Sequence, residues 1–236
     1  MESNYDTIKF DTAYPKLAKS LSDGRYCYVV QRRISLYITA FCARKGITAN
    51  TATGIDMILA VLASCCLAQG YYIGGAVLIQ LFGVWSCVDG EIARLAKSTS
   101  SLGDFYDTMT DRTAEFLIVA GLFYSLSEVP ATLSWGTTFF TYIGMVFLIT
   151  ASSEKFRSVY QKNYSKNRYE AIFNWLCAGS DTRLIYLSVS IVAYALNGHA
   201  ESIQWPVIAL SVLLGINFLF RMWKISTLPK EDRSCI

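Results

Sequence analysis

Long apolar runs separated by short polar segments dominate the chain. From Met57 to Val88 there is no charged residue, and the run is interrupted only by turn-forming residues near 69–75. About 20 apolar residues are enough to cross a bilayer, so this run predicts two helices joined by a short turn. The pattern as a whole predicts an all-α, polytopic membrane protein with six transmembrane helices, at residues 51–69, 72–97, 103–127, 134–154, 183–198 and 204–226.

A different pattern precedes the first span. Within residues 26–45, apolar side chains recur at helical spacing on one face and polar side chains occupy the other (Val30, Ile34, Tyr37, Ile38 and Phe41 against Arg32, Arg33, Ser35 and Thr39). Such a helix is typical of the membrane–water interface. The chain is therefore expected to consist of a cytoplasmic N-terminal segment (1–49) with this interfacial helix, a six-helix transmembrane domain (50–226) and a cytoplasmic tail (227–236).

Positive charges indicate the orientation. The 21 Lys and Arg residues fall before the first span, at the junction of the second and third, between the fourth and fifth, and after the sixth. The turns near 70–72, 127–134 and 197–203 carry none. By the positive-inside rule, both termini and the junction of the second and third spans face the cytoplasm. Residues 1–24 are polar and mixed in charge, so no cleavable signal peptide is expected.

Composition narrows the possible functions. The chain is 53% hydrophobic and 17% charged, with a net charge of +3 and a mean hydropathy of +0.34. No long basic block occurs, so no nucleic-acid partner is expected. Seven cysteines are scattered without zinc-site spacing and read as reduced thiols. The single histidine, His199, lies on the expected outer side, which excludes a histidine metal centre and a Ser-His triad at the inner face.

Carboxylates concentrate at the junction of the second and third spans. Asp104, Asp107 and Asp111 share one helical stripe, and Ser86 and Asp89 share a stripe on the preceding helix. If the two helices pack antiparallel, these stripes can face each other. Gathered oxygen ligands suit a hard cation such as Mg²⁺ or Mn²⁺. The alternative is that the aspartates cap helix ends or pair with neighbouring basic residues (Arg94, Lys97 and Arg112).

Two glycines and an arginine flank these carboxylates. Gly90 and Gly103 leave room for a nucleotide or a backbone to approach, and Arg94 offers a fork for phosphate oxygens. The spacing from 86 to 111 resembles the motif D-x-x-D-G-x-x-A-R-x8-G-x-x-x-D-x-x-x-D of the CDP-alcohol phosphotransferase family. Eight of its nine positions match; the exception is Ser86, where the family has its first aspartate.

The resemblance implies an activity and roles for individual residues. Members transfer a substituted phosphate from a CDP-alcohol, such as CDP-diacylglycerol, to an acceptor alcohol and release CMP, usually as homodimers. Two divalent ions, Mg²⁺ or Mn²⁺, would be held by Asp89, Asp107 and Asp111, with Asp111 also the general base. The nucleotide would lie against Asp89, Gly90, Ala93, Arg94 and Gly103.

Ser86 leaves the activity open. A hydroxyl is a weaker ligand than a carboxylate, and three carboxylates leave one positive charge uncompensated against two divalent ions. Asp104, one turn before Asp107, is a candidate substitute. The serine is compatible with a natural variant of altered metal use, with an engineered substitution, or with an impaired or inactive homologue that acts as a binding or scaffold protein. A small transporter is disfavoured, because inverted halves are absent and the acidic residues all lie at one end.

A basic segment between the fourth and fifth spans is the candidate acceptor site. Lys155, Arg157 and Arg183 favour a phosphorylated acceptor, although snorkelling at the inner surface also explains such residues. The donor is either CDP-diacylglycerol with a water-soluble acceptor, such as an inositol phosphate, glycerol phosphate or serine, or a soluble CDP-alcohol with a lipid or polyol acceptor.

Overall fold

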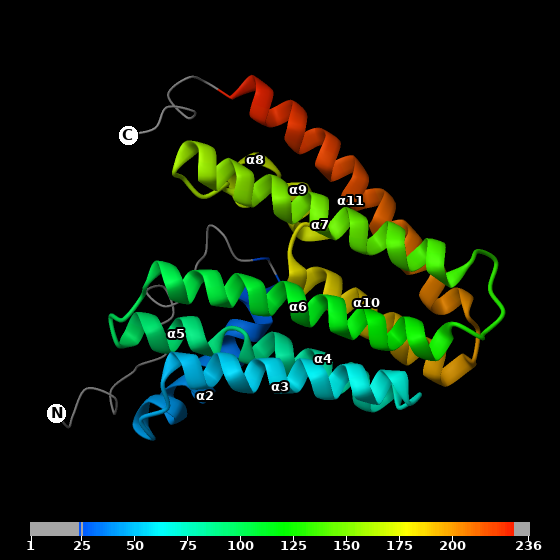
Figure 1. Cartoon of the computed structure of the whole chain (residues 1–236), viewed down its shortest axis with the longest axis horizontal. Helices are drawn as coiled ribbons and strands as arrows, with labels where there is room; N and C mark the ends of the chain where they lie inside the picture. Colours follow the sequence, from blue (N-terminus) through cyan, green and yellow to red (C-terminus); the bar gives the residue numbers. More distant parts are fainter. Residues whose placement is uncertain (1–23, 25, 229–236) are drawn as a thin grey trace.

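Long helices form a closed bundle in the computed structural model, which describes Gly24 and residues 26–228. In ring order, α6 (Ser101–Leu126), α3 (Ala49–Ala68), α4 (Tyr72–Trp85), α10 (Ser180–Asn197), α11 (Glu201–Thr227) and α7 (Trp135–Tyr160) each pack on two neighbours. Figure 1 shows α3, α4 and α6 side by side, with α7 and α11 crossing on the opposite side. The described residues form no strand, so the all-α prediction is confirmed.

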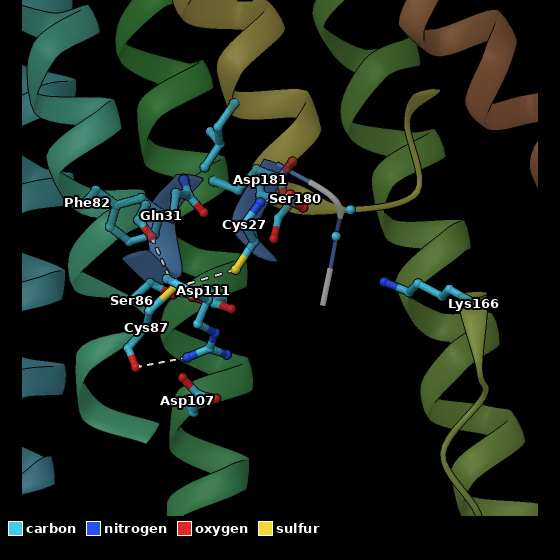
Figure 2. A pocket seen from close by; sticks show the side chains of 16 residues that line it. Cys27, Gln31, Phe82, Ser86, Cys87, Asp107, Asp111, Lys166, Ser180 and Asp181 are labelled. Atoms are coloured by element: carbon cyan, nitrogen blue, oxygen red, sulfur yellow. Dashed lines mark hydrogen bonds between the residues drawn. The ribbon is translucent and has the colours of Figure 1, made fainter. Parts of the chain in front are cut away.

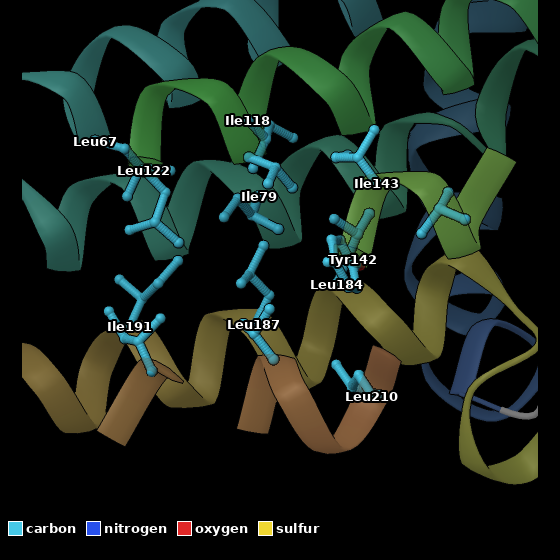
Figure 3. Close-up of a cluster of buried hydrophobic side chains, with 14 of the residues drawn as sticks. Leu67, Ile79, Ile118, Leu122, Tyr142, Ile143, Leu184, Leu187, Ile191 and Leu210 are labelled. Atoms are coloured by element: carbon cyan, nitrogen blue, oxygen red, sulfur yellow. The ribbon is translucent and has the colours of Figure 1, made fainter. Parts of the chain in front are cut away.

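A continuous apolar core fills the ring. Each long helix contributes a buried stripe, and Figure 3 shows side chains from these helices meeting in the middle of the bundle. The α3–α6 contact is especially close: a Cβ added at Gly121 would lie 2.4 Å from the backbone oxygen of Ser64. Ser64 also donates to the Leu117 carbonyl at 2.7 Å. α3 is therefore held at short distance from α6, the helix that carries the second half of the motif.

The second expected span is one helix with a tightened turn. After α4 ends at Trp85, α5 (Val88–Leu95) continues it, and the intervening Cys87 amide bonds to the Val84 carbonyl rather than one residue further back. Ser86 lies in this turn. The loop at 96–100 then reverses the chain, and Ser100 caps α6 by accepting from the Gly103 amide at 3.0 Å.

Among the residues that the structure describes, five helical stretches are long and apolar enough to cross a membrane: Ala49–Ala68, Tyr72–Leu95, Trp135–Tyr160, Ala171–Asn197 and Glu201–Thr227. They correspond to five of the six expected spans. The remaining one, α6, is also long, at 26 residues, but its first half carries several charged side chains (Asp104, Asp107, Asp111, Arg112 and Glu115). Between α7 and α10 lie two short helices, α8 (Lys166–Tyr169) and α9 (Ala171–Leu176).

The expected interfacial helix corresponds to the π-helical turn η1 (Cys27–Gln31) followed by α2 (Arg32–Arg44). Its polar face turns inward: Arg32, Ser35 and Thr39 all donate to Glu91 of α5, at 2.6 to 3.0 Å. Its apolar face is left exposed, with Tyr37 at 69% accessibility. Buried polar contacts thus fix the helix to the motif, and its apolar face is available for other contacts.

Candidate functional site

Asp89 is held by two donors at the start of α5. Thr53 of α3 donates to its Oδ2 at 2.7 Å, and the Gly90 amide donates to its Oδ1 at 2.5 Å. The side chain is buried, at 5% accessibility. These bonds fix the carboxylate between α3 and α5 while charge-assisted donors support its ionised form.

Asp107 and Asp111 face α5 from α6, as the antiparallel stripes predict. Ser86 donates to Asp111 Oδ1 at 3.1 Å, so the serine occupies its expected place beside the last carboxylate of the motif. Figure 2 shows Ser86, Cys87, Asp107 and Asp111 gathered on one side of a cavity, with Lys166 on the opposite side. The third acidic residue of the α6 stripe, Asp104, pairs with Arg157 of α7.

A cavity of about 590 Å³ lies between α3, α5 and α6, and is called here the α3–α5–α6 cavity. Its wall contains every residue that the motif assigns to a nucleotide: Asp89, Gly90, Ala93, Arg94 and Gly103. Its volume is in the range of small-molecule and cofactor sites, ~300–1,000 Å³. A Cβ at Gly90 would lie 3.1 Å from Arg94 Nη1, so glycine lets the guanidinium lie close to the helix.

Two smaller cavities meet the first at Asp107. The α4–α10 cavity, about 240 Å³, runs from Ser86 and Asp111 to Lys166. The α6–α7 cavity, about 290 Å³, is lined by four basic residues (Arg112, Arg157, Lys166 and Arg183) and four acidic ones (Asp104, Asp107, Asp111 and Glu154). Asp107 lines all three cavities and Asp111 lines both smaller ones. Asp107 and Asp111 therefore lie where a nucleotide-sized space meets one that contains several basic side chains.

The three basic residues expected to bind an acceptor are placed differently. Arg183 is buried and makes a bidentate pair with Glu115, at 2.7 and 2.9 Å. Arg157 pairs at 2.5 Å with Asp104, and both side chains are more than one-third exposed, at 43% and 37%. Lys155 is exposed on α7 and lines none of the three cavities. Arg183 thus has a structural partner, and Arg157 lies at the rim.

Two further residues of the site were not selected from the sequence. Lys166 lines both smaller cavities and donates to the Ala178 carbonyl at 3.2 Å. Burial, together with the positive charges of Arg221, Arg183 and Arg112, lowers the pKa of Lys166 to about 8. It lies inside the connection expected between the fourth and fifth spans, where no helical periodicity marked it.

The second is Asp56 of α3, which is 2% exposed. Its Oδ1 has no hydrogen-bond partner among the described residues. The charges that act on it most strongly are all negative, first Asp111, then Asp89 and Asp107. Asp56 lies inside the first expected span, 51–69, and belongs to no position of the motif.

The donor set fits a hard divalent cation in chemistry and charge. It consists of carboxylate oxygens on three helices, one of them buried and unpaired. Within the part of the chain that the structure describes, no three His, Cys, Asp or Glu side chains already converge as a metal cage. Mutual repulsion between like charges is a physical reason for carboxylates to stay apart before a cation neutralises them.

Comparison with known proteins decides the family. A family model described as CDP-alcohol phosphatidyltransferase matches residues 46–217, which is most of the chain and includes the whole motif. The chain belongs to the CDP-alcohol phosphatidyltransferase family. Membership in this family accounts for the two glycines, Arg94 and the three aspartates of the motif, and leaves Ser86 and Asp56 as features to explain.

Several individual relatives are similar to the chain. The bifunctional IPC transferase and DIPP synthase of Thermococcus kodakarensis is 26% identical over 148 residues, which is 63% of this chain and 33% of that protein. Its counterpart from Aquifex aeolicus is 22% identical over 87% of this chain and 46% of that protein. The chain thus spans less than half of these relatives. The phosphatidylinositol phosphate synthase of Cutibacterium acnes is 29% identical over 72% of this chain and 78% of that protein.

Solved structures share the fold. The phosphatidylinositol phosphate synthase of Mycobacterium tuberculosis with CDP-DAG bound superimposes with a TM-score of 0.68 at 16% identity, covering 84% of this chain and 96% of that chain. The same enzyme in complex with manganese and citrate gives a TM-score of 0.66 at 15% identity, covering 83% and 90%. At this identity the likeness establishes the helical architecture.

Proposed function

We propose that this protein is a metal-dependent CDP-alcohol phosphotransferase, which transfers a substituted phosphate from a CDP-alcohol such as CDP-diacylglycerol to an acceptor alcohol and releases CMP. One observation carries the proposal: all five nucleotide positions of the motif line a single cavity, and that cavity shares Asp107 with the α6–α7 cavity, where Arg112, Arg157, Lys166 and Arg183 lie. Family membership and the names of the relatives support it. The reaction belongs to polar-lipid biosynthesis.

In this proposal the α3–α5–α6 cavity holds the cytidine nucleotide. Gly90 and Gly103 add no side chain to the cavity wall. Arg94 lies against Gly90, where its guanidinium would face the phosphates. Asp89, Asp107 and Asp111 are the candidate metal ligands. Mg²⁺ or Mn²⁺ bound there would neutralise charge on the attacking and leaving oxygens of the pyrophosphate.

Asp111 is the proposed general base. It lines the cavities on the acceptor side and not the α3–α5–α6 cavity. It would take the proton of the acceptor hydroxyl as that oxygen bonds to the β-phosphorus and the bond to the CMP oxygen breaks. Ser86, which donates to Asp111 at 3.1 Å, would orient this carboxylate.

A phosphorylated acceptor suits the α6–α7 cavity. Lys166 faces it, and Arg112 has a buried Nε without a hydrogen-bond partner among the described residues. Charge-assisted bonds from such donors are the usual means of holding a phosphate. Arg157 would contribute from the rim, and Arg183 would act through Glu115. The relative named as a phosphatidylinositol phosphate synthase supports this acceptor class.

The proposed setting is a membrane crossed by six spans: the five apolar stretches described above and α6. The uncharged second half of α6, from residue 116 to 126, together with its central place in the ring, supports this count. The exposed apolar face of α2, with Ile34, Tyr37 and Phe41, supports an interfacial position for that helix. Both termini and the site would face the cytoplasm, with the domain limits given by the sequence. A homodimer is proposed from the family resemblance.

The decisive experiment measures CMP release by the purified protein with Mn²⁺ or Mg²⁺, CDP-diacylglycerol and a panel of alcohol acceptors. We expect turnover that depends on both the ion and an acceptor, and a loss of at least ~100-fold in Asp107→Asn. Unchanged turnover in Asp107→Asn would contradict the proposal, as would a failure of every donor and acceptor pair.

Ser86 supports a second candidate function, a binding or scaffold protein that keeps the fold without catalysis. The Ser86→Asp variant separates the two. A large gain in CMP release from an otherwise silent protein would identify the serine as the cause of inactivity. Silence of both forms with every donor, together with retained binding of a CDP-alcohol, would favour the binding protein.

A further inference from the structure

Asp56 is a buried carboxylate that the motif does not contain. It lies on the inward stripe of α3, where the other buried residues are small or apolar (Ala52, Ala60, Ala63 and Leu67). Only 2% of it is exposed, and its Oδ1 has no partner in the described part of the chain. Burying a carboxylate without a partner is strongly unfavourable, so its presence calls for a compensating ligand.

The contacts around Asp56 show which part of the molecule its side chain faces. Thr53, one turn earlier on the same face, donates to Asp89 at 2.7 Å. The Trp85 indole donates to the Ala52 carbonyl at 3.0 Å. This part of α3 therefore packs on the turn between α4 and α5 that contains Ser86, and Asp56 is turned toward the motif rather than toward the outside of the bundle.

The charges around Asp56 show what the ligand would have to be. Asp111 acts on it most strongly, followed by Asp89 and Asp107. Asp111 is also the carboxylate that Ser86 contacts, at 3.1 Å. Asp56 thus adds its negative charge on the side of the site where the motif expects a carboxylate at position 86. A group of like charges around a buried, unpaired oxygen is relieved when a proton or a cation binds among them, and only a cation relieves all four carboxylates together.

We propose that Asp56 supplies, from α3, the carboxylate that the motif lacks at Ser86, so that Asp56, Asp89, Asp107 and Asp111 together hold divalent metal. This inference rests on the proposed function. It keeps the number of carboxylates at four, which balances two divalent ions. Relative to the family motif, the fourth negative charge has moved from position 86 to Asp56 on the neighbouring helix α3, and the total charge of the site is the same.

The first test measures Mn²⁺ binding to the purified full-length protein without nucleotide, with the electron paramagnetic resonance signal of the free ion as the readout. We expect Asp56→Asn to raise the Kd for Mn²⁺ by at least ~10-fold, since even residues behind a ligand contribute ~10–100-fold. The matched control is Asp104→Asn, which removes an aspartate paired with Arg157 on the surface and should change the Kd by less than about fivefold. Wild-type affinity in Asp56→Asn would overturn the inference.

A second variant tests the exchange itself. If Asp56 replaces the missing carboxylate, then Ser86→Asp combined with Asp56→Asn should bind Mn²⁺ at least ~10-fold more tightly than Asp56→Asn alone. Equal binding by these two proteins would contradict the exchange. Because the readout contains no CDP-alcohol, it is independent of turnover: absent CMP release overturns the proposed function, whereas unchanged Mn²⁺ binding overturns only the role of Asp56.

Thermal unfolding distinguishes a ligand from a purely structural residue. Without metal, Asp56→Asn should unfold at the same or a higher temperature, because it removes a buried charge that repels three others. With saturating Mn²⁺, the wild type should gain more stability than the variant. A lower unfolding temperature of the metal-free variant would mean that Asp56 serves the fold, and would overturn the inference.

Discussion

On the α7–α11 side of the bundle, Arg221 is fully buried and all its nitrogens are engaged. It pairs with Glu170 through two bonds and donates to the Ile149 carbonyl and to two serine hydroxyls. On the α3–α6 side, Asp56 is equally buried, has an unpaired oxygen and faces other carboxylates. Both side chains are charged groups inside an apolar ring, and their surroundings are opposite.

The difference separates architecture from chemistry. A buried ion pair with satisfied hydrogen bonds is complete in the folded chain, and removing one partner exposes the other to an apolar interior. Carboxylates that face one another are incomplete until something cationic binds. The Arg183–Glu115 pair belongs to the first kind, which is why a residue expected to bind substrate is better understood as part of the frame.

Breaking the paired side should produce the largest change in stability. We expect Arg221→Met to lose ~3–5 kcal/mol of unfolding free energy, because Glu170 would remain buried without its partner. Unfolding by a denaturing detergent measures this loss. Adding Glu170→Gln to Arg221→Met should recover part of the lost stability. If Arg221→Met alone unfolds with a free energy within about 1 kcal/mol of the wild type, the distinction between the two sides is refuted.

Breaking the unpaired side should instead change turnover. Asp111→Asn is expected to lower kcat by ~10²–10⁴-fold, the usual contribution of a general base, without lowering the unfolding temperature. The control is Ser86→Ala, which removes only the bond to Asp111 and should lower kcat by less than about tenfold. CMP release at saturating Mn²⁺ measures both. A destabilised Asp111→Asn protein would assign this carboxylate to the frame.

The same contrast explains what the sequence could predict. The expected helices agree with the structure to within two or three residues at most ends, because long uncharged runs and their flanking turns are local signals. The fourth span is longer than expected: α7 continues to Tyr160 rather than ending at 154, since backbone hydrogen bonds do not stop where hydropathy falls.

Nonlocal contacts were harder to predict. The nucleotide positions share one cavity because the motif itself fixes their spacing on two helices and the loop between them. Asp56 reaches the motif only through the packing of α3, and Glu115 meets Arg183 across 68 residues. No periodicity within one segment reports such meetings. The sequence therefore identified the motif and missed what packs against it.

Lys166 sharpens the comparison, because it is a partly buried charge that faces an open cavity. We expect Lys166→Met to raise the KM for a phosphorylated acceptor by ~10–100-fold, the usual range for a lost bond to a charged group. The KM for the CDP-alcohol should not change, because Lys166 does not line the α3–α5–α6 cavity. Steady-state CMP release with each substrate varied in turn measures the two constants.

The pH dependence provides an independent check on Lys166. Burial and the positive charges of Arg221, Arg183 and Arg112 lower its pKa to about 8, and the negative charge of Glu170 opposes this shift. Asp181 also interacts with Lys166. The ammonium is charged below that pH and loses its charge above it, so the acceptor KM should rise as the pH passes about 8. Lys166→Arg stays charged and should remove this rise. An identical profile in Lys166→Arg would contradict the assignment.

The smallest effect is expected at the exposed pair. Arg157 and Asp104 contact each other at 2.5 Å, but both are more than one-third exposed, at 43% and 37%, so solvent and salt weaken their attraction. We expect Arg157→Gln to change the unfolding free energy by less than about 1 kcal/mol and the acceptor KM by less than about fivefold. Lys155→Gln is the matched control, since it removes a positive charge from the same helix outside all three cavities. The opposite outcome would be an acceptor KM that rises in Arg157→Gln as far as in Lys166→Met and stays unchanged in Lys155→Gln. Arg157 would then bind the acceptor directly, and solvent exposure would not distinguish binding residues from surface residues in this cavity.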